Sequence, residues 1–251
     1  MKQFILGAPD HEMREIERVL LINGIPYSFA TTRGRIVQSH EAYKASGTTT
    51  LVPTNTDIIF VECAVMGLTP VYRIDHHNEG DPGFGKLPHE YLEGSSLGQV
   101  LDYLGIEATQ EQRIIAAADH CLAHAYQGRC PGVTPAELSA WRIRSRATAR
   151  GLSEAELVSQ IATATEALRQ APTIVVEGMQ VAWFDNVPPE VSEASARVGV
   201  PFAFIRKESD GRVKSGIRSA PARVVEAWIR TCGLKGIYGD PQRGFAGGYF
   251  S

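Results

Sequence analysis

Three adjacent side chains that can bind a metal ion, Asp75, His76 and His77, lie between a strand-like segment and a loop. The segment before them, residues 70–74, reads Pro-Val-Tyr-Arg-Ile, and residues 79–85 after them are rich in Gly, Asp and Pro. Strands of parallel sheets are short apolar runs, and open α/β sheets bind ligands beyond the carboxyl ends of their strands. Neighbouring residues that leave a strand point to opposite sides, so we expect different roles for His76 and His77. The alternative interpretation is a polar strand end with solvated histidines.

Further acidic residues follow the other strands that the N-terminal sequence predicts. Asp10 and Glu12 come after the first strand, and Glu62 lies near the end of the next buried one. Asp119 lies in a largely apolar helical segment, where a buried carboxylate is costly unless it is paired or bound to metal. Oxygen and imidazole ligands together suit divalent ions such as Mn²⁺ or Mg²⁺. Bridging carboxylates would also allow two ions per site, with a bridging water as the nucleophile for phosphoryl chemistry.

Strand and helix patterns alternate through the N-terminal half, which predicts a parallel sheet with helices on both faces. The expected strands cover residues 2–6, 27–30, 57–65 and 70–75. The expected helices cover residues 12–22, 95–103 and 111–126. Asp10 could therefore serve as the N-cap of the first helix, an alternative to metal binding.

A second, smaller α/β domain is expected at the C-terminus. Ser153 and Glu156 form a capping box that opens a helix continuing to Pro172. The strands expected after it cover residues 173–177, 179–184, 201–206 and 212–218, with helices at 190–198 and 221–232. We therefore predict an N-terminal domain at 1–150, a connecting helix at 151–172 and a C-terminal domain at 173–251, with the active site in the cleft between the domains.

Composition narrows the classes of partner. The chain has 251 residues, 43% hydrophobic and 21% charged, which is ordinary for a soluble globular protein. Its net charge of −3 gives no basic footprint, so long nucleic acid is not expected as a partner. The four cysteines form no CxxC pair, which argues against a zinc ribbon and a disulfide framework. No signal peptide or membrane span is visible, so we expect a cytoplasmic protein with no membrane partner.

Five short motifs follow one another along the chain. They are Pro9-Asp10-His11-Glu12, Val61-Glu62-Cys63, Asp75-His76-His77, Ser95-Ser96 before a helix, and Asp119, which lies 44 residues beyond Asp75 (119 − 75). In order and type they resemble the motifs of the DHH phosphoesterase superfamily, and the resemblance covers nearly the whole chain. That superfamily includes family II inorganic pyrophosphatases, single-strand exonucleases, and hydrolases of short oligonucleotides and cyclic dinucleotides. The C-terminal segment is similar to its substrate-binding DHH-associated domain, with Lys214–Ser219 as a basic strand and residues 244–248 as a Gly-rich loop.

The resemblance implies a role for each motif residue. The implied ligands of Mn²⁺ or another divalent ion, two per site, are Asp10, Glu12, Glu62, His76 and Asp119. His77 would contact the phosphate or the leaving oxygen, and Asp75 would orient a histidine. The implied substrate-binding residues are Lys214, Arg218, Gly247 and Gly248. A solvated strand face explains Lys214 and Arg218 equally well.

The chain also departs from the pattern of that superfamily. Leu6 stands where a histidine is usual, and Glu12 and Glu62 stand where aspartates are usual. His11, His120 and His124 are candidates to supply the missing imidazole. The Gly-rich segment also ends in Tyr-Phe-Ser without the usual histidine.

We therefore expect a metal-dependent phosphoesterase that hydrolyses a small nucleotide or a short oligonucleotide phosphodiester by metal-bound hydroxide. One alternative is a catalytically silent protein of the same fold that binds a nucleotide or another protein. A second alternative is a phosphatase of a small phosphorylated metabolite. The sequence leaves a homodimer open.

Overall fold

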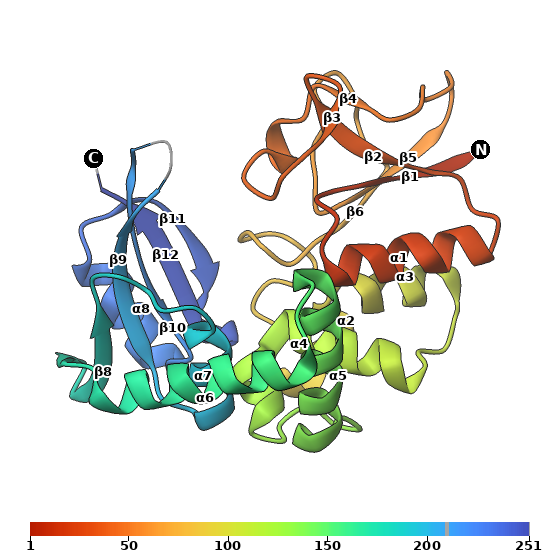
Figure 1. Ribbon diagram of the computed structural model, residues 1–251. Coiled ribbons are helices and arrows are strands. Elements are labelled where there is room, and N and C mark those ends of the chain that lie inside the picture. Colours follow the sequence, from red (N-terminus) through yellow and green to blue (C-terminus); the bar gives the residue numbers. More distant parts are fainter. Residues whose placement is uncertain (209–210, 251) are drawn as a thin grey trace. The chain divides into compact units, whose positions relative to one another are not determined.

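In the computed structural model, which describes residues 1–208 and 211–250, the chain forms two units, each built on one sheet (Figure 1). The first unit comprises Met1–Lys86 and Glu90–Asp119, and the second comprises Leu87–His89 and the described residues from His120 onward. The division at Asp119–His120 differs from the boundary expected near residues 150–172. No helix in the described ranges is long and apolar enough to cross a membrane.

The sheet of the first unit is mostly parallel. Its strand order is β3 (Arg35–Ile36), β2 (Tyr27–Thr32), β1 (Lys2–Leu6), β5 (Asp57–Val61) and β6 (Tyr72–Ile74), and the short β4 (Gly47–Thr48) also pairs with β2. Strands β2, β1, β5 and β6 run parallel, whereas β3 and β4 are antiparallel to β2. Leu6 pairs with Val61, and Val61 pairs with Ile74. The carboxyl ends of three strands are therefore level.

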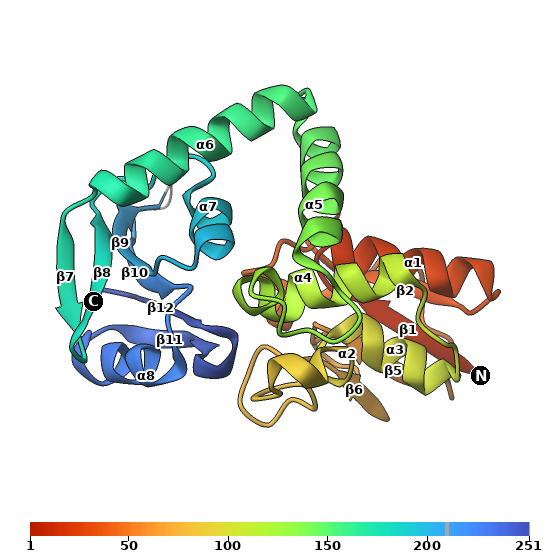
Figure 2. The same cartoon turned by 90° about the horizontal axis from the view of Figure 1, so that it is seen from below.

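Helices cover one face of this sheet. Helices α1 (His11–Ile22) and α3 (Ser96–Leu104) lie side by side (Figures 1 and 2), and Phe4 of β1 contacts Tyr103 of α3 with ring centroids 5.8 Å apart. The next residue, Ile5, points to the opposite face and packs in a cluster that includes Ala42 and Phe60. That face is covered by the 3₁₀ helix η1 (Ala42–Lys44) and loop segments, where the sequence predicted helices on both faces.

Helical segments alone lie between β6 of the first sheet and β7 of the second along the chain. They begin with η2 (Pro88–Glu90) and α2 (Tyr91–Gly94), and after α3 comes α4 (Gln110–Tyr126), which is broken at Cys121. Helix α5 (Pro135–Arg150), which the sequence did not predict, begins with a capping box formed by Thr134 and Glu137. Helix α6 (Glu154–Gln170) begins with the predicted box of Ser153 and Glu156.

Helices α5 and α6 belong to the second unit because they share its core. The apolar positions of α6, Leu157, Ile161 and Leu168, pack with Phe202 and Phe204 of the second sheet. Ala147 of α5 is part of the same cluster. This packing explains why the connecting helix is not a separate linker.

The second sheet is mostly antiparallel. Its order is β11 (Lys235–Asp240), β12 (Phe245–Tyr249), β10 (Val213–Arg218), β9 (Phe202–Lys207), β8 (Met179–Phe184) and β7 (Thr173–Val176). Among the described pairings of this sheet, only that of β8 with β9 is parallel. Helix α8 (Ala222–Thr231) covers one face, whereas α6 and α7 (Val191–Val198) pack on the other.

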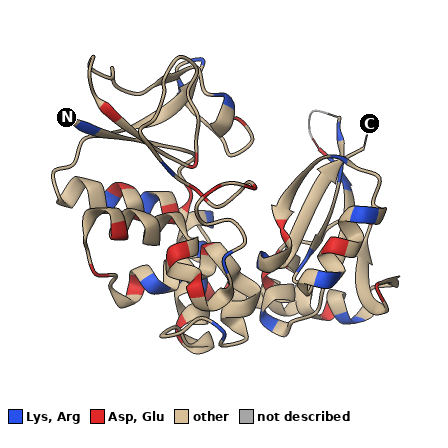
Figure 3. Cartoon of the chain, turned by 180° about the vertical axis from the view of Figure 1, so that it is seen from behind, with Lys and Arg blue, Asp and Glu red and all other residues tan. Residues whose placement is uncertain are grey.

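One sequence prediction about this sheet is wrong. Residues 244–248 were expected to form a Gly-rich loop, but Phe245–Tyr249 form strand β12, which follows η3 (Pro241–Arg243). Gly247 pairs with Gly216 of β10. Basic and acidic residues are interspersed along the elements of both units (Figure 3).

Candidate metal site

The level strand ends of the first sheet position the acidic residues of the site. Glu62 directly follows Val61 of β5, and Asp75 directly follows Ile74 of the neighbouring β6. Glu62 has a φ of 49°, in the left-handed region that side chains other than glycine adopt only at some cost. Gly7, after β1, lies so close that an added Cβ would be 2.5 Å from the Glu62 carbonyl oxygen. Only glycine therefore lets the end of β1 pass the Glu62 backbone.

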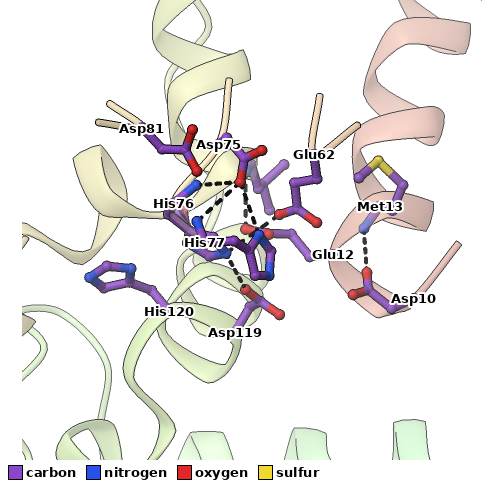
Figure 4. Close-up of polar contacts among 12 residues, drawn as sticks. Asp10, Glu12, Met13, Glu62, Asp75, His76, His77, Asp81, Asp119 and His120 are labelled. Carbon is purple, nitrogen blue, oxygen red and sulfur yellow. Dashed lines mark hydrogen bonds and ion pairs between the residues drawn. The ribbon is translucent and has the colours of Figure 1, made fainter. Parts of the chain in front are cut away.

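Four side chains converge at this edge of the sheet. Glu12, Glu62, His76 and Asp119 each offer one ligand atom, and these atoms all lie within 4.8 Å of one another (Figure 4). His76 Nε2 lies 3.5 Å from Glu62 Oε1 and 3.2 Å from Asp119 Oδ2. The first three residues are buried and Asp119 is half-buried. A second group contains Glu62, His76 and His77. The acidic and histidine cluster could therefore hold a metal ion.

The orientation of His76 suits a metal ligand. Its Nδ1 lies 3.0 Å from the carbonyl oxygen of Gly94, at the end of α2. A carbonyl only accepts hydrogen bonds, so this contact places the ring proton on Nδ1. Nε2 then presents its lone pair toward Glu62 and Asp119, as metal-binding imidazoles do when the other nitrogen donates to a backbone carbonyl.

Asp75 holds the turn that carries both histidines. Its Oδ1 accepts hydrogen bonds from the backbone nitrogens of His76 and His77, at 2.7 and 3.1 Å, and lies 3.0 Å from His77 Nδ1. Burial opposes ionisation here, but the hydrogen bond and charge of His77 outweigh it and lower the pKa of Asp75. Asp75 lies outside both ligand groups. This geometry agrees with the role that the sequence suggested, namely that Asp75 orients a histidine.

The pKa values of the two buried glutamates of the cluster, Glu12 and Glu62, are both raised. Burial raises the pKa of Glu62 to about 7, and Asp119 adds to the shift through its charge. Burial, followed by the charges of Asp119 and Glu62, raises the pKa of Glu12 well above its usual range. Glu12 Oε1 accepts a hydrogen bond from the Leu97 nitrogen at 3.0 Å, while its Oε2 is buried and has no hydrogen-bond partner in the described part of the chain. A divalent cation fits this set, because it would coordinate the buried oxygen and offset the mutual repulsion.

Asp10 has a different position from the other predicted ligands. Its Oδ1 accepts a hydrogen bond from the Met13 nitrogen at 2.9 Å, so it caps α1 as the alternative interpretation held. It belongs to neither ligand group. Desolvation by the surrounding protein, followed by the charge of Asp119, nevertheless raises the pKa of Asp10 to about 6. His11, His120 and His124 also lie outside both groups, so within the described residues the structure does not place them as the missing imidazole.

Sequence reasoning missed two residues that support the site. The hydroxyl of Tyr43 donates to both Asp75 oxygens, at 3.1 and 2.9 Å, and the Tyr43 ring contacts His77. Gln99 of α3 donates from Nε2 to the carbonyl oxygens of Asp75 and Gly94, at 3.1 and 3.2 Å, and its Oε1 accepts from the Asp75 nitrogen at 3.3 Å. Gln99 thus bonds both backbone polar groups of Asp75, directly after β6. No sequence signal marks either residue, because both act across long separations in the chain.

The predicted substrate residues lie in the second unit. Lys214, Gly216 and Arg218 alternate along β10 and therefore share one face of the sheet. Burial lowers the pKa of Arg218, which has no carboxylate partner among the described residues and lies 5.6 Å from the Phe245 ring. Lys214 lies over the rings of Tyr238 and Tyr249, at 4.9 and 5.9 Å.

The two predicted glycines lie on opposite faces. An added Cβ on Gly247 would be 2.3 Å from the Tyr238 hydroxyl oxygen. Gly247 therefore makes room for that ring on the face that carries Lys214 and Arg218, which we call the basic face. An added Cβ on Gly248 would be 2.9 Å from the Leu234 side chain. Leu234 packs against the core beneath α8, so Gly248 faces that core. The structure therefore separates Gly248 from Lys214 and Arg218.

Comparison with protein-family models, with curated proteins and with solved structures found no match to this chain. The class of protein is therefore defined by its geometry: a two-unit α/β protein with a cluster of carboxylates and histidine that could bind a metal ion.

Proposed function

We propose that this protein is a divalent-metal-dependent phosphoesterase of the DHH type. The observation that carries the proposal is the convergence of Glu12, Glu62, His76 and Asp119, with His76 Nε2 directed at two carboxylates. Oxygen-rich sites with one imidazole suit Mn²⁺ or Mg²⁺ better than soft metals. Ions of this kind, when bound, lower the pKa of water and polarise a phosphoryl oxygen.

The protein groups supply orientation and proton control. Glu12, Glu62, His76 and Asp119 would hold the first ion. Glu62 and His76 also belong to the second ligand group, with His77, and of these only the Glu62 carboxylate has two oxygens that could serve two ions. His77 is suited to contact the substrate, because its side chain is 41% exposed while Asp75 fixes its Nδ1. In its protonated form, His77 would donate a proton from Nε2 to the leaving oxygen.

The basic face of the second sheet supports a small phosphorylated substrate. Arg218 offers a guanidinium with no acidic partner among the described residues, which suits bidentate binding of a phosphate. The rings of Tyr238 and Tyr249 beside Lys214 could stack on a nucleobase. A net charge of −3 disfavours a long polyanion. A small nucleotide or a short oligonucleotide is therefore the proposed substrate.

The test is hydrolysis of a panel of dinucleotides, cyclic dinucleotides and phosphomonoesters with added Mn²⁺. We expect cleavage of phosphodiesters that is lost in His76→Ala and kept in His40→Ala, a matched change at an exposed histidine of the same unit. Arg218→Ala should raise KM by about 10- to 100-fold with little change in kcat, because it removes charge-assisted hydrogen bonds to the substrate and no residue of either ligand group. A protein that binds Mn²⁺ but cleaves nothing would refute the phosphoesterase proposal.

A silent binding protein is the second candidate. Leu6 stands in place of the usual histidine, and the Leu97 nitrogen occupies one oxygen of Glu12, a residue that replaces the usual aspartate. Both features reduce the donors available to metal. Titration with Mn²⁺ separates the candidates, because a silent protein without metal would show no saturable binding. Preference for phosphomonoesters in the panel would instead favour a metabolite phosphatase.

A further inference from the structure

Two of the four cysteines touch each other. Cys121 Sγ and Cys130 Sγ lie 3.1 Å apart in the second unit, and both residues are 1% exposed. The sulfurs of Cys63 and Cys232 instead donate to backbone carbonyl oxygens, at 3.2 and 3.4 Å. A disulfide has a sulfur–sulfur bond of about 2.05 Å, so closing the pair needs an approach of roughly 1 Å.

The local backbone can accommodate that approach. Cys121 interrupts α4 with a φ of −149° and a ψ of 51°, so its backbone departs from helical geometry at this position. Cys130 lies in the connection to α5, between Gly128 and Gly132, which have φ values of 70° and 78°. An irregular helix position thus faces a loop flanked by glycines, and small adjustments at either end would bring the sulfurs together.

We propose that Cys121 and Cys130 form a reversible disulfide, with hydrogen peroxide as the oxidant. One thiolate attacks peroxide, the O–O bond breaks, and the sulfur becomes a sulfenic acid while the released hydroxide takes up a proton. The second thiol attacks that sulfur, the S–S bond forms, and the S–O bond breaks to release water. The two thiols lose two electrons, and one peroxide becomes two waters.

Hydrogen peroxide is small and neutral, so it can reach a buried pair of thiols more easily than a bulky disulfide oxidant can. The partner thiol at 3.1 Å would trap the sulfenic acid before it is oxidised further, as a resolving cysteine does. Disulfides in reducing compartments are usually transient and redox-sensing. The reaction requires no metal and is independent of the phosphoesterase proposal.

Trypsin makes the test direct. Cleavage after Arg113, Arg129 and Arg142 places Cys121 in the peptide of residues 114–129 and Cys130 in that of residues 130–142. The full-length protein is treated with about one equivalent of hydrogen peroxide, denatured, alkylated and digested. We expect the two peptides joined by a disulfide that dithiothreitol reverses, with Cys63 still alkylated as a thiol. The oxidised protein should also resist denaturant better, because closing a 10-residue loop raises the folding equilibrium constant by about a hundredfold.

Matched variants sharpen the result. Cys232→Ser should leave the cross-link intact, whereas Cys130→Ser should leave Cys121 as a sulfenic acid that dimedone labels. The wild-type digestion alone decides the matter if a variant does not fold. Full alkylation of both cysteines after the peroxide dose, or a cross-link involving Cys63 or Cys232 in place of this one, would overturn the proposal.

Discussion

Replacing Glu62 by glutamine should stabilise the metal-free protein at neutral and higher pH. Glu62 is buried beside Glu12 and Asp119, and its pKa is about 7, compared with a usual value of 4.5. Folding therefore opposes ionisation of this carboxyl group. Below pH 4.5 the group is neutral in the folded and unfolded states, so it costs nothing. As the pH rises from 4.5 to 7, the unfolded state loses its proton first and is favoured.

The expected size follows from the same two pKa values. A difference of about 2.5 units, at 1.36 kcal/mol per unit, corresponds to about 3 kcal/mol of stability lost once the pH exceeds 7. Glutamine keeps the shape of the side chain but carries no charge. Glu62→Gln should therefore be more stable than the wild type by up to about 3 kcal/mol at pH 8, and about equal to it at pH 4.

The assay is urea denaturation of the full-length protein with a chelator present, at pH 4 and pH 8. Glu107→Gln removes an exposed carboxylate of the same unit and should have little effect at either pH. Adding Mn²⁺ at 100 times its Kd should stabilise the wild type by about 2.7 kcal/mol and the variant by much less. A variant that is less stable than the wild type at pH 8 without metal would refute the electrostatic reasoning, because it would show that the charge of Glu62 is already compensated.

Three other substitutions test separate parts of the structure. His76→Ala should remove most of the affinity for Mn²⁺ in calorimetric titration, while the circular dichroism spectrum is retained; unchanged stoichiometry and affinity would exclude His76 as a ligand. Gln99→Leu should weaken Mn²⁺ binding by about 10- to 100-fold, because it removes three hydrogen bonds around Asp75 and Gly94. Wild-type affinity in this variant would show that the turn at Asp75 keeps its conformation without Gln99. Glu193→Ala should destabilise the second unit by about 3–5 kcal/mol in urea without affecting metal binding, because it leaves two half-buried arginines uncompensated. A loss under 1 kcal/mol would show that these ion pairs contribute little.

The strand ends of the first sheet explain how far sequence could predict the site. Strands β1, β5 and β6 are short apolar runs, so their ends are visible in the sequence. In a parallel sheet, adjacent strands that end level bring the residues after them together. The meeting of Glu62 and His76 could therefore be expected from the sequence alone. The exact register, such as the pairing of Val61 with Ile74, could not, because several registers would bury the same apolar side chains.

Residues whose roles depend on distant partners could not be predicted. Tyr43 reaches Asp75 across 32 positions, and Gln99 reaches it across 24, with no periodic pattern to mark either. Strand β12 has two adjacent glycines, which normally disfavour strands. It forms because Gly247 accommodates the Tyr238 ring and Gly248 packs against Leu234. Helix α5 buries only three residues in 16, so its apolar stripe is weak, although its capping box was readable.

Two buried glutamates show how differently the units balance their charges. Glu193 in the second unit has fully buried oxygens that contact Arg142, Arg197 and Tyr126. Burial alone would raise the pKa of Glu193, but the charge of Arg142 and the other contacts lower it to about 2. Its charge is therefore compensated within the protein, and it serves to join α4, α5 and α7.

Glu62 in the first unit is also buried, but its pKa shifts in the opposite direction. Within the described residues its only ion-pair partner is His76, whose Nε2 also faces Asp119. The same residue type, at similar burial, thus has a pKa of about 7 in one unit and about 2 in the other. The difference is the presence of arginine. Among the described residues, no arginine or lysine pairs with Glu62, so a metal ion held by the cluster could supply the balancing positive charge.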